Sequence, residues 1–283
     1  MRRNQRVIWS AFVLCLFCAV AATTRLHGKD QTATLTAEFH QTYPINANGR
    51  VSLENINGAV HISSWDRNEV KVDAVKRANS QKRLDEAKIE VNADSGSISI
   101  RTKYPQGTQH WDSDDQAASV EYTLTVPKNA HLDAIKLING SLDISNINGD
   151  VEASCINGRL TAKGLTGEVK LSTINGPAEA QINPSGNGHI VVSSVNGPVD
   201  LTLPSDIKGR VEASTVTGGI SNDFGLSVNH QLVGHKLDGE IGSGGSRIEL
   251  KNVNGPIQIH RASDGHSPSA VKDLSAHDDD NQI

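Results

Sequence analysis

The chain has few aromatic residues: its 283 residues include 4 Phe, 3 Tyr and 3 Trp, together with a single Met. A core built mainly from large aromatic side chains is therefore excluded. The chain instead holds 25 Gly, with Val, Ile and Leu residues that alternate with Ser, Thr and Asn. This mixture is typical of many short strands separated by glycine turns, so the composition predicts an all-β protein.

An excess of basic side chains is also missing. The 27 Lys and Arg residues are outnumbered by 32 Asp and Glu residues, and the formal net charge is −5. Such a composition gives no electrostatic support for neutralising a phosphate backbone. We therefore expect no nucleic-acid partner.

Cysteine is scarce, with 3 in the chain. Cys15 and Cys18 form a Cys-x-x-Cys pattern, but both lie inside an apolar run rather than in a redox domain. If that run is removed, Cys155 is the remaining thiol and no internal disulfide can form. Cys155 occupies a repeat position held elsewhere by small residues, so we predict a small buried filler rather than a nucleophile.

The N-terminus has the form of a secretory signal peptide. Arg2, Arg3 and Arg6 precede the apolar run from Val7 to Ala22, which ends in small residues. The run is shorter than the roughly 20 apolar residues of a membrane span, and an uncleaved anchor is the alternative. Either form predicts an exported protein that is periplasmic, at the cell surface or secreted.

The rest of the chain divides by pattern. We expect a signal peptide or anchor over residues 1–22, a polar linker over 23–42, one β domain over 43–262 and a disordered acidic tail over 263–283. Within the domain, the stretch QKRLDEAK (81–88) carries helix formers and follows Asn79 and Ser80, which are both good helix caps. This stretch predicts one short helix.

A glycine repeat governs the second half of the chain. Glycines recur every nine residues and then every twenty-one: Gly140, Gly149, Gly158, Gly167 and Gly176, each preceded by Asn or Thr, followed by Gly197, Gly218 and Gly239. A fixed period is the mark of a repeat architecture. Asn-Gly tolerates positive φ, so these pairs predict sharp turns between strands.

Two topologies fit the repeat: an antiparallel meander, or a solenoid in which successive coils stack. The aliphatic residue before each turn favours the solenoid, because in a meander it would lie on the face opposite the core residues, whereas at a solenoid corner it can point inward. We therefore expect this set to be buried: Ile56, Ile138, Ile147, Ile156, Leu165, Ile174, Val195 and Val253. A meander or β-sandwich remains the alternative.

Three stretches resemble a bacterial family of adhesin domains of unknown function, akin to the head-GIN type. They are VSLENINGAVHISSWDRNEVKVDAVKRA (51–78), VEYTLTVPKNAHL (120–132) and the INGxVxA units from Ile138 onward. The resemblance covers roughly Tyr43 to Arg261. It implies a right-handed single-stranded β-helix, an exported location and no established catalytic residues, while surface adhesion follows from the family's name alone.

No constellation of side chains predicts catalysis or metal binding. Calcium-binding nonapeptide repeats need an Asp at a fixed place in each unit, and these units have none. The acidic loop residues Asp112, Asp114 and Asp115 are interpreted as a solvated loop. Glycosidase chemistry needs a carboxylate pair, whereas the charged repeat positions vary in sign and are expected to face solvent: Asp143, Glu152, Arg159, Lys163 and Lys170.

The aromatic residues gather in the first half of the chain. Trp65, Trp111, Tyr104 and Tyr122 could stack on a sugar or a partner, but packing of Trp65 on the first coil and of Trp111 in its loop is the simpler interpretation. Further on, GSGGS (242–246) lacks the Gly-x-Ser-x-Gly nucleophile motif and is expected to form a turn.

These observations predict a non-enzymatic, exported scaffold of the cell envelope or secreted fraction. It would present a repetitive β surface to a surface, a polysaccharide or a protein, without a cofactor, and would touch a membrane only through its N-terminal segment. An envelope sensor or assembly component that acts by end-to-end stacking is the first alternative. A carbohydrate-active enzyme is the second.

Overall fold

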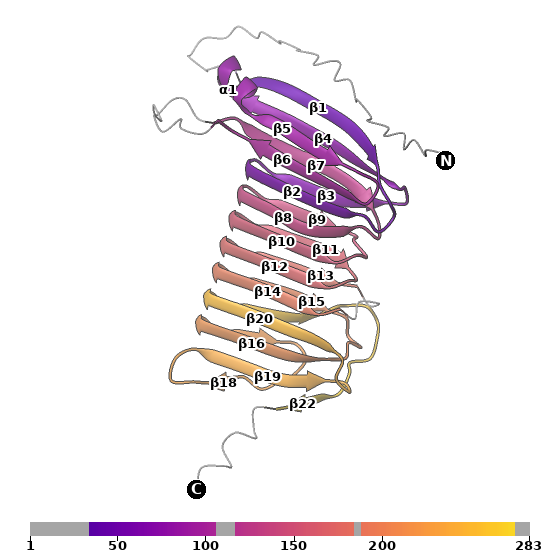
Figure 1. The fold of residues 1–283 in the computed structure, drawn as a ribbon. Helices are drawn as coiled ribbons and strands as arrows, with labels where there is room; N and C mark the ends of the chain where they lie inside the picture. The colour runs from indigo at the N-terminus through magenta and orange to yellow at the C-terminus, as the bar shows by residue number, and fades with distance from the viewer. Residues whose placement is uncertain (1–33, 106–116, 184–187, 275–283) are drawn as a thin grey trace, which may run out of the picture.

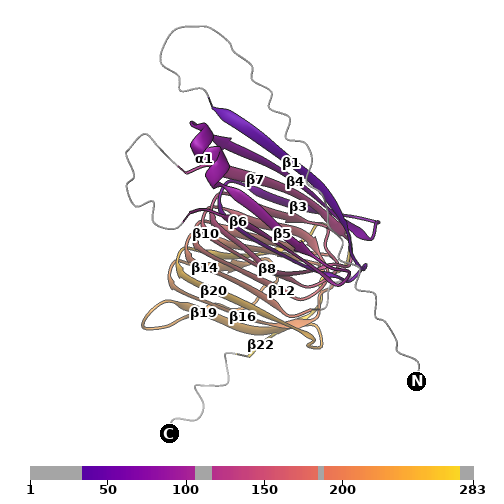
Figure 2. The ribbon, with the colours of Figure 1, turned by 45° about the horizontal axis from the view of Figure 1, so that its top comes forward.

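The computed structural model describes residues 34–105, 117–183 and 188–274. Nearly all regular secondary structure of the described chain is β-strand, arranged as a long stack of strands in two large sheets (Figures 1 and 2). One short helix, α1 (Gln81–Glu86), lies at the N-terminal end of the stack. An all-β fold is thus confirmed.

The first sheet has ten strands and contains both parallel and antiparallel pairs. In spatial order it runs β1 (Leu35–Pro44), β4 (Glu69–Ala78), β7 (Ser119–Pro127), β3 (Val60–Trp65), β9 (Leu142–Ser145), β11 (Leu160–Leu165), β13 (Ala178–Ile182), β15 (Val199–Leu203), β21 (Ile257–Arg261) and β17 (Ile220–Asn222).

The second sheet has twelve strands. In spatial order it runs β18 (Asn229–His230), β19 (His235–Ile241), β16 (Gly209–Thr217), β20 (Ser246–Asn254), β14 (Ile190–Asn196), β12 (Val169–Asn175), β10 (Val151–Asn157), β8 (His131–Asn139), β2 (Arg50–Asn57), β6 (Ser97–Lys103) and β5 (Lys88–Ala93), with β22 (Val271–Asp273) paired to β19.

In the middle of the molecule the chain alternates between the two sheets. Strand β10 of the second sheet leads to β11 of the first and then back to β12, which pairs parallel with β10 so that Val151 lies beside Val169. Because adjacent central strands are parallel, the antiparallel meander is wrong for these coils. Antiparallel pairs occur nearer the ends, such as β1 with β4, β5 with β6 and β16 with β19.

The order of the coils departs from the order of the sequence at both ends. The coil of β2 and β3 lies between the coil of β6 and β7 and the coil of β8 and β9. Near the C-terminus, β20 and β21 lie between β14 and β15 on one side and β16 and β17 on the other. The latest coil in the sequence is therefore an interior coil of the stack.

The core lies between the sheets and is aliphatic, as the composition requires. In β10 the burial alternates along the strand, so that Val151, Ala153 and Cys155 are buried and Glu152 is exposed. The parallel partner β12 repeats the pattern in register, which places Leu171 beside Ala153. Burial of these aliphatic side chains is the main stabilising term that a fold with so few aromatics can use.

The strand-forming region is longer than the predicted domain of residues 43–262. Strand β1 begins at Leu35, inside the segment expected to be a linker, and pairs with β4 along its whole length. Strand β22 lies inside the segment expected to be a disordered tail. Strand β1 was missed because its exposed positions are mostly polar and none of its residues is fully buried, and β22 was missed because it has three residues, all exposed.

The predicted helix is confirmed. It begins after Ser80, whose hydroxyl accepts a hydrogen bond from the backbone N–H of Arg83, and it is shorter than expected, ending at Glu86. The Lys76 ammonium group donates to the carbonyl oxygens of Leu84 (2.8 Å) and Ala87 (3.2 Å), which lie at the end of the helix. This contact places positive charge at the negative end of the helix.

The inward orientation predicted for the aliphatic residues before the turns is only half right. At one bend Ile147 and Leu165 are fully buried, but at the other Ile156 and Ile174 are 38% and 44% exposed. The reason is local geometry. Gly164, with φ of 71°, breaks the alternation near the end of β11, and the register shifts between Lys163 and Leu165, so the next aliphatic turns inward.

No such break occurs at the ends of the strands in the second sheet. Strict alternation continues from Val151 through Cys155, so the following residue, Ile156, faces outward. The correction applies along the whole stack: Ile138, Val195 and Val253 are also exposed, and Ile56 is half-buried.

The glycine repeat likewise separates into different groups. Gly140, Gly158 and Gly176 have φ between 142° and 150°, where glycine is strongly favoured. Gly149 and Gly167 are not among the residues with positive φ. The period of twenty-one fails at its last member, because Gly239 lies within β19 and not at a turn.

The predicted signal peptide or anchor of residues 1–22 lies outside the described residues. Among the residues that the structure does describe, no helix is long and apolar enough to cross a bilayer.

A histidine on β1 makes the stability of the pairing between β1 and β4 sensitive to pH. His40 lies 2.7 Å from Asp73 of β4 and 3.1 Å from Glu38, and these hydrogen bonds raise its pKa above the ordinary 6.5. Because the folded pKa is the higher one, the stabilisation is present below about pH 6.5 and is lost as the pH rises through the folded value.

We expect Asp73→Asn to lower the pKa of His40 toward its ordinary value, because it removes the charged acceptor at 2.7 Å. The titration of the His40 ring protons by NMR measures the change. An unaltered pKa in this variant would show that the pairing is not formed in solution.

Candidate functional site

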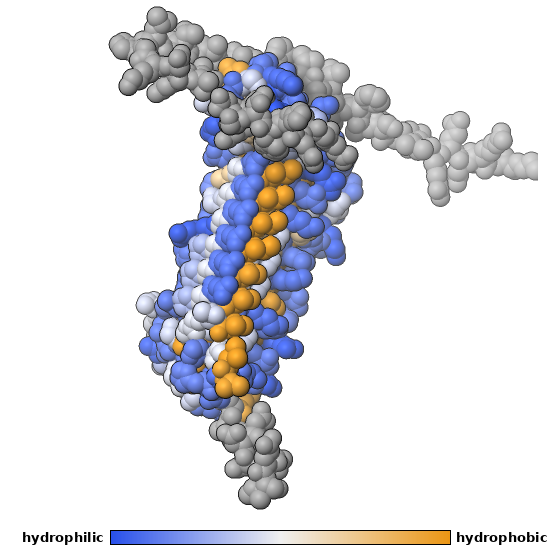
Figure 3. Space-filling view, turned by 90° about the vertical axis from the view of Figure 1, so that its left-hand side faces the viewer, coloured by the Kyte–Doolittle hydropathy of each residue, from blue (hydrophilic) through white to orange (hydrophobic). Residues whose placement is uncertain are grey.

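One long edge of the stack carries a column of exposed aliphatic side chains. It lies at the bend that follows the strands of the second sheet, one residue per coil. Figure 3 looks onto this edge and shows the column as a continuous orange stripe along the long axis of the molecule. We call it the aliphatic stripe; in spatial order it consists of Ile56, Ile138, Ile156, Ile174, Val195, Val253 and Val216.

The exposure of the stripe is nearly uniform. Ile138, Ile156 and Val195 are 37%, 38% and 39% exposed, and Val216 reaches 52%. Isolated exposed aliphatic residues are ordinary on protein surfaces, but a contiguous row of them marks an interaction site more often than chance. Most of the large hydrophobic residues that are exposed on the described surface belong to this row.

A ladder of asparagine side chains runs beside the stripe. The Asn157 amide nitrogen donates to Asn139 Oδ1 at 2.9 Å, and the Asn175 amide donates to Asn157 Oδ1 at 2.8 Å. The same bond is repeated between the other neighbouring coils. We call this the Asn ladder: Asn57, Asn139, Asn157, Asn175, Asn196 and Asn254.

The ladder leaves hydrogen-bonding capacity at the surface. A carboxamide has two N–H donors and an oxygen that accepts two bonds. Each interior rung uses one N–H toward one neighbouring coil and one acceptor site toward the other. A donor and an acceptor per coil therefore remain for solvent or a partner.

We expect Asn157→Asp to lower the free energy of unfolding by about 1–2 kcal/mol, because the carboxylate cannot donate to Asn139 Oδ1 and instead faces an acceptor. The loss should shrink at low pH, where a protonated carboxyl can donate. Urea unfolding at neutral and acidic pH measures both effects. Asn92→Asp, at an exposed position on β5, is the charge-matched control, and equal losses in the two variants would contradict the ladder's contribution.

Glycines stack directly behind the ladder. A Cβ on Gly140 would lie 2.6 Å from the carbonyl oxygen of Gly58, and similar clashes recur at Gly176 and Gly197. Coils can approach this closely only when the position has no side chain. The Asn-Gly pair thus serves two purposes: Asn links the coils, and Gly lets them stack.

Inside the bend, small polar side chains bind the carbonyl oxygens of these glycines. Ser194 Oγ donates to Gly176 O at 3.2 Å, and Thr215 Oγ1 donates to Gly255 O at 3.0 Å. Cys155 takes the same place, with its Sγ 3.4 Å from Gly140 O. It is 1% exposed, and burial raises the pKa of its thiol, so the prediction of a buried filler is confirmed.

At its N-terminal end the stripe borders a groove of about 660 Å³. Ile56, Ile138 and Ile156 line its apolar part, and Tyr104 lines it on the β6 side. Its charged residues are partly paired: Glu54 lies 2.7 Å from Arg101 and 4.0 Å from Lys136. The groove is thus a continuation of the stripe with a charged margin.

Charged residues singled out in the sequence are used mainly between neighbouring coils. Lys170 pairs with Glu152 at 2.9 Å, and Lys163 pairs with Glu179 at 2.7 Å. Asp143 lies 3.1 Å from His61 of an adjacent strand. They stand on the outer faces of the sheets, as expected. The predicted loop carboxylates Asp112, Asp114 and Asp115 lie outside the described residues.

The aromatic residues do not form one platform. Trp65 donates its indole N–H to the Glu69 carbonyl at 2.8 Å, and the Arg67 guanidinium lies 4.9 Å from its ring centre. Tyr122 is fully buried, and the Tyr104 hydroxyl donates to the Ala118 carbonyl at 2.8 Å. Trp111 lies outside the described residues.

The segment 242–246 forms the turn between β19 and β20, as expected. Positive φ values at Gly242, Gly244 and Gly245 show why glycine is needed there.

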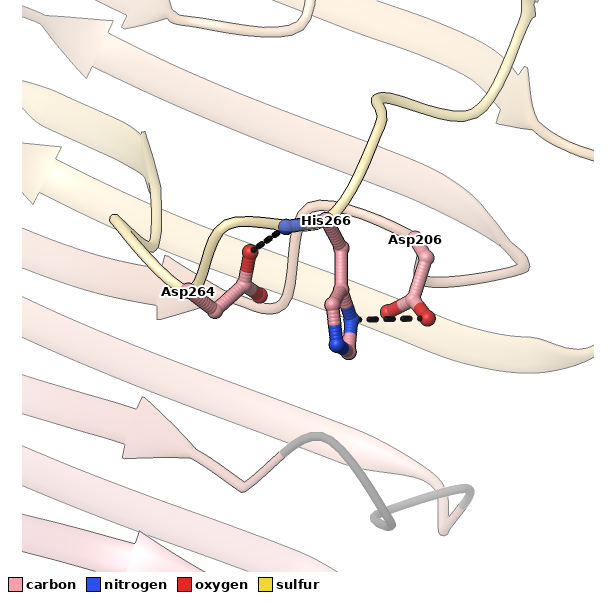
Figure 4. A group of neighbouring side chains, drawn as sticks. All are labelled: Asp206, Asp264 and His266. Atoms are coloured by element: carbon pink, nitrogen blue, oxygen red, sulfur yellow. Dashed lines mark hydrogen bonds and ion pairs between the residues drawn. The ribbon is translucent and has the colours of Figure 1, made fainter.

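One group of possible metal ligands, which the sequence did not indicate, is brought together by the fold. Asp206, Asp264 and His266 each offer an atom within 4.8 Å of the others (Figure 4). However, Asp264 already accepts hydrogen bonds from the backbone N–H groups of Ser205 (2.9 Å) and His266 (3.1 Å), which lower its pKa to about 2. His266 Nδ1 lies 3.0 Å from Asp206. We assign these contacts a structural role in tethering two connections.

The sequence did not indicate the stripe as a surface either. Its members were expected to point inward. Strict alternation from the buried residues Ala153 and Cys155 places Ile156 outward, but the same rule would also place the buried Leu165 outward, so alternation alone does not identify the stripe.

No family model matches the sequence, and no curated protein matches it. Solved structures with a related arrangement include a candidate cell adhesion protein from Clostridium sporogenes, with 13% identity, a TM-score of 0.47 and coverage of 80% of this chain and 100% of the other. A candidate adhesin from Bacteroides fragilis has 12% identity and a TM-score of 0.35, covering 78% and 96%.

A third structure is a candidate lipid-binding protein from Parabacteroides distasonis, with 10% identity and a TM-score of 0.27, covering 80% of this chain and 96% of the other. All three TM-scores are below 0.5, so no function is transferred from these proteins to this chain.

Proposed function

We propose that the chain is a non-enzymatic, exported scaffold of the adhesin type, a right-handed β-solenoid that engages a partner through its aliphatic edge. The observation that carries the proposal is the stripe beside the Asn ladder. An exposed or half-buried Ile or Val occurs in every coil from Ile56 to Val216, and in every coil but that of Val216, which has Thr217, an Asn carboxamide follows it. Such a surface combines apolar contact with regular hydrogen bonding.

The charges of the repeat support a scaffold more than a catalyst. Glycosidase chemistry needs a converging carboxylate pair, whereas carboxylates such as Glu152 and Glu179 each lie beside a lysine of an adjacent coil. These pairs join neighbouring coils at the surface. Their arrangement is that of solubilising, coil-linking residues.

The proposal that the protein is exported rests on its N-terminal sequence. The apolar run from Val7 to Ala22 follows Arg2, Arg3 and Arg6 and ends in small residues, which is the pattern of a signal peptide. The protein would then act in the periplasm, at the cell surface or outside the cell.

The test is a binding screen of the exported protein against neutral and charged glycans, envelope polymers and intact cells. We expect saturable binding without turnover, and its loss in the double variant Ile156→Asp/Ile174→Asp. The matched control is Thr161→Asp/Gln181→Asp, which adds the same charge on outward positions of β11 and β13. Cleavage of a glycan, or equal binding by both double variants, would overturn the proposal.

A further inference from the structure

The aliphatic stripe is a large, contiguous apolar surface. With exposures between 37% and 52% for its exposed members, the stripe amounts to on the order of 500 Å² of apolar area, near the upper end of the largest patches on monomeric proteins. We infer that a second copy of this chain covers the stripe, so that two stacks lie side by side along this edge. The inference rests on the proposed function and names a second copy as the partner at that same site, so a glycan or cell-surface ligand of the stripe would compete with the dimer.

Spacing is the first argument for a second copy. Neighbouring strands are about 4.8 Å apart, so the stripe presents an aliphatic group at every such step from β2 to β16. A partner that contacts it along its whole length must present apolar groups at the same step. A second copy has this period by construction, and its stripe can contact the first one coil by coil.

Area is the second argument. The Asn ladder on one side and the serines Ser154, Ser172 and Ser193 on the other widen the contact face, because these residues point outward beside the stripe. Together the columns reach on the order of 800 Å², which is what each partner buries in an interface of standard size. A narrow ligand such as a single extended polymer chain would leave part of this face uncovered.

Charge is the third argument, and it selects the orientation. The central coils carry Ser, Ile or Val, Asn and Gly across this face, with the exposed Arg159 after Gly158 at its margin, so the middle of the face can be covered without burying an unpaired ion. Charges return toward the ends of the serine column, as Lys136 in β8 and Lys251 in β20. A two-fold axis perpendicular to the stripe would place Lys136 of one copy near Lys251 of the other.

A two-fold axis parallel to the stripe avoids this repulsion. It places each coil beside the same coil of the second copy and brings the serine column of one copy opposite the Asn ladder of the other. Ser154 then faces Asn157, and Lys136 faces Asn139. The serine hydroxyls meet the carboxamide donors and acceptors that the ladder leaves free. The stripes therefore run parallel, with each Ile or Val beside its own counterpart.

The test is the mass of the exported protein in solution. Sedimentation over about 1–100 µM should show a reversible dimer, as expected for a non-obligate interface of this size. Ile156→Asp/Ile174→Asp should weaken association more than about 100-fold, because it buries unpaired carboxylates. Thr161→Asp/Gln181→Asp should leave the dimer intact, and circular dichroism should show that both variants fold.

Cross-linking tests the orientation. Ile138→Cys and Val253→Cys are made separately and treated with a short bismaleimide, and each should form a cross-linked dimer with itself. In the antiparallel arrangement two copies of position 138 would be about 19 Å apart, four strand spacings, and only a mixture of the two variants would cross-link. Cross-linking only in the mixture would overturn the parallel orientation. Cys155 is buried, and the wild-type protein is the control for its reactivity.

The outcomes separate the two proposals. A monomeric wild type whose stripe variant still loses binding to a glycan or cell surface overturns the dimer and retains the proposed function. A dimer that the stripe variant does not disturb overturns the inference, as does an open series of larger species that would indicate end-to-end stacking. A dimer lost only in the stripe variant supports the inference.

Discussion

Gly158→Val is expected to lower the free energy of unfolding by at least about 3 kcal/mol. Gly158 has φ of 148°, and a β-branched residue in such a region pays about 1–3 kcal/mol in backbone strain. A Cβ there would also clash with the carbonyl group of Gly140 in the adjacent coil, whose carbon is 2.8 Å away. Forcing the coils apart adds a cost of similar size.

The effect should be visible in urea unfolding, because the total stability of a domain is commonly about 5–15 kcal/mol. Gly219→Val is the matched control. A Cβ on Gly219 would meet no neighbouring heavy atom within 4 Å, and the backbone there has no positive φ, so we expect a change within about 0.5 kcal/mol. Similar losses at the two positions would contradict the close stacking of glycines.

Asn55→Leu is expected to cost about 3 kcal/mol, because it removes the centre of a buried polar network. Asn55 is 2% exposed, and its amide donates to the Val120 carbonyl at 2.8 Å. Its Oδ1 accepts a hydrogen bond from Thr102 Oγ1 at 3.0 Å, and the Thr102 hydroxyl lies 2.8 Å from the Tyr122 hydroxyl. Each polar group left buried without a partner costs about 1–3 kcal/mol.

The network joins strands β2, β6 and β7, where the coil order departs from the sequence order. Tyr122 reports on the same environment, since burial raises its pKa to about 12. In the next coil, Leu137 occupies the position in register with Asn55. A leucine is therefore accommodated at the same position of a neighbouring coil. We attribute the predicted loss of stability in Asn55→Leu to the lost hydrogen bonds and not to a steric clash.

A mutant cycle separates these causes. Thr102→Val with Tyr122→Phe should cost less in the Asn55→Leu background than in the wild type, because the Thr102 hydroxyl has then already lost its acceptor, Asn55 Oδ1. Urea unfolding of the four proteins provides the comparison. Strictly additive losses would show that the three residues do not act as a network.

The strands and the short helix were predictable because their signals are local. Alternation identifies β10 and its relatives, and Ser80 followed by helix formers identifies α1. The direction of the aliphatic residues before the turns was not predictable. Whether such a residue points inward or outward depends on the backbone conformation of one preceding residue. A positive φ at Asn146 or Gly164 shifts the alternation, whereas no residue with positive φ precedes Ile156 within its strand.

The order of the coils was not predictable for a different reason. The INGxV units are chemically alike, so β14 can in principle pair with β16 or with β20. The choice depends on contacts far apart in the sequence, such as Ile190 with Ile248. The continuity of the aliphatic stripe was unpredictable for the same reason, because the stripe is continuous only where Val253 of β20 lies between Val195 and Val216.

The position of β20 and β21 between two earlier coils has a consequence for a chain that emerges from an export channel N-terminus first. Strands β16 and β17 leave the channel before residues 246–261, yet they have no neighbour among the earlier coils until β20 and β21 arrive between them. Until then, the open flank of β14 and β15 stays unpaired and accessible to other strands. Maturation would therefore be completed late, and a chain cut short at residue 245 would be left with two separated halves and exposed edges.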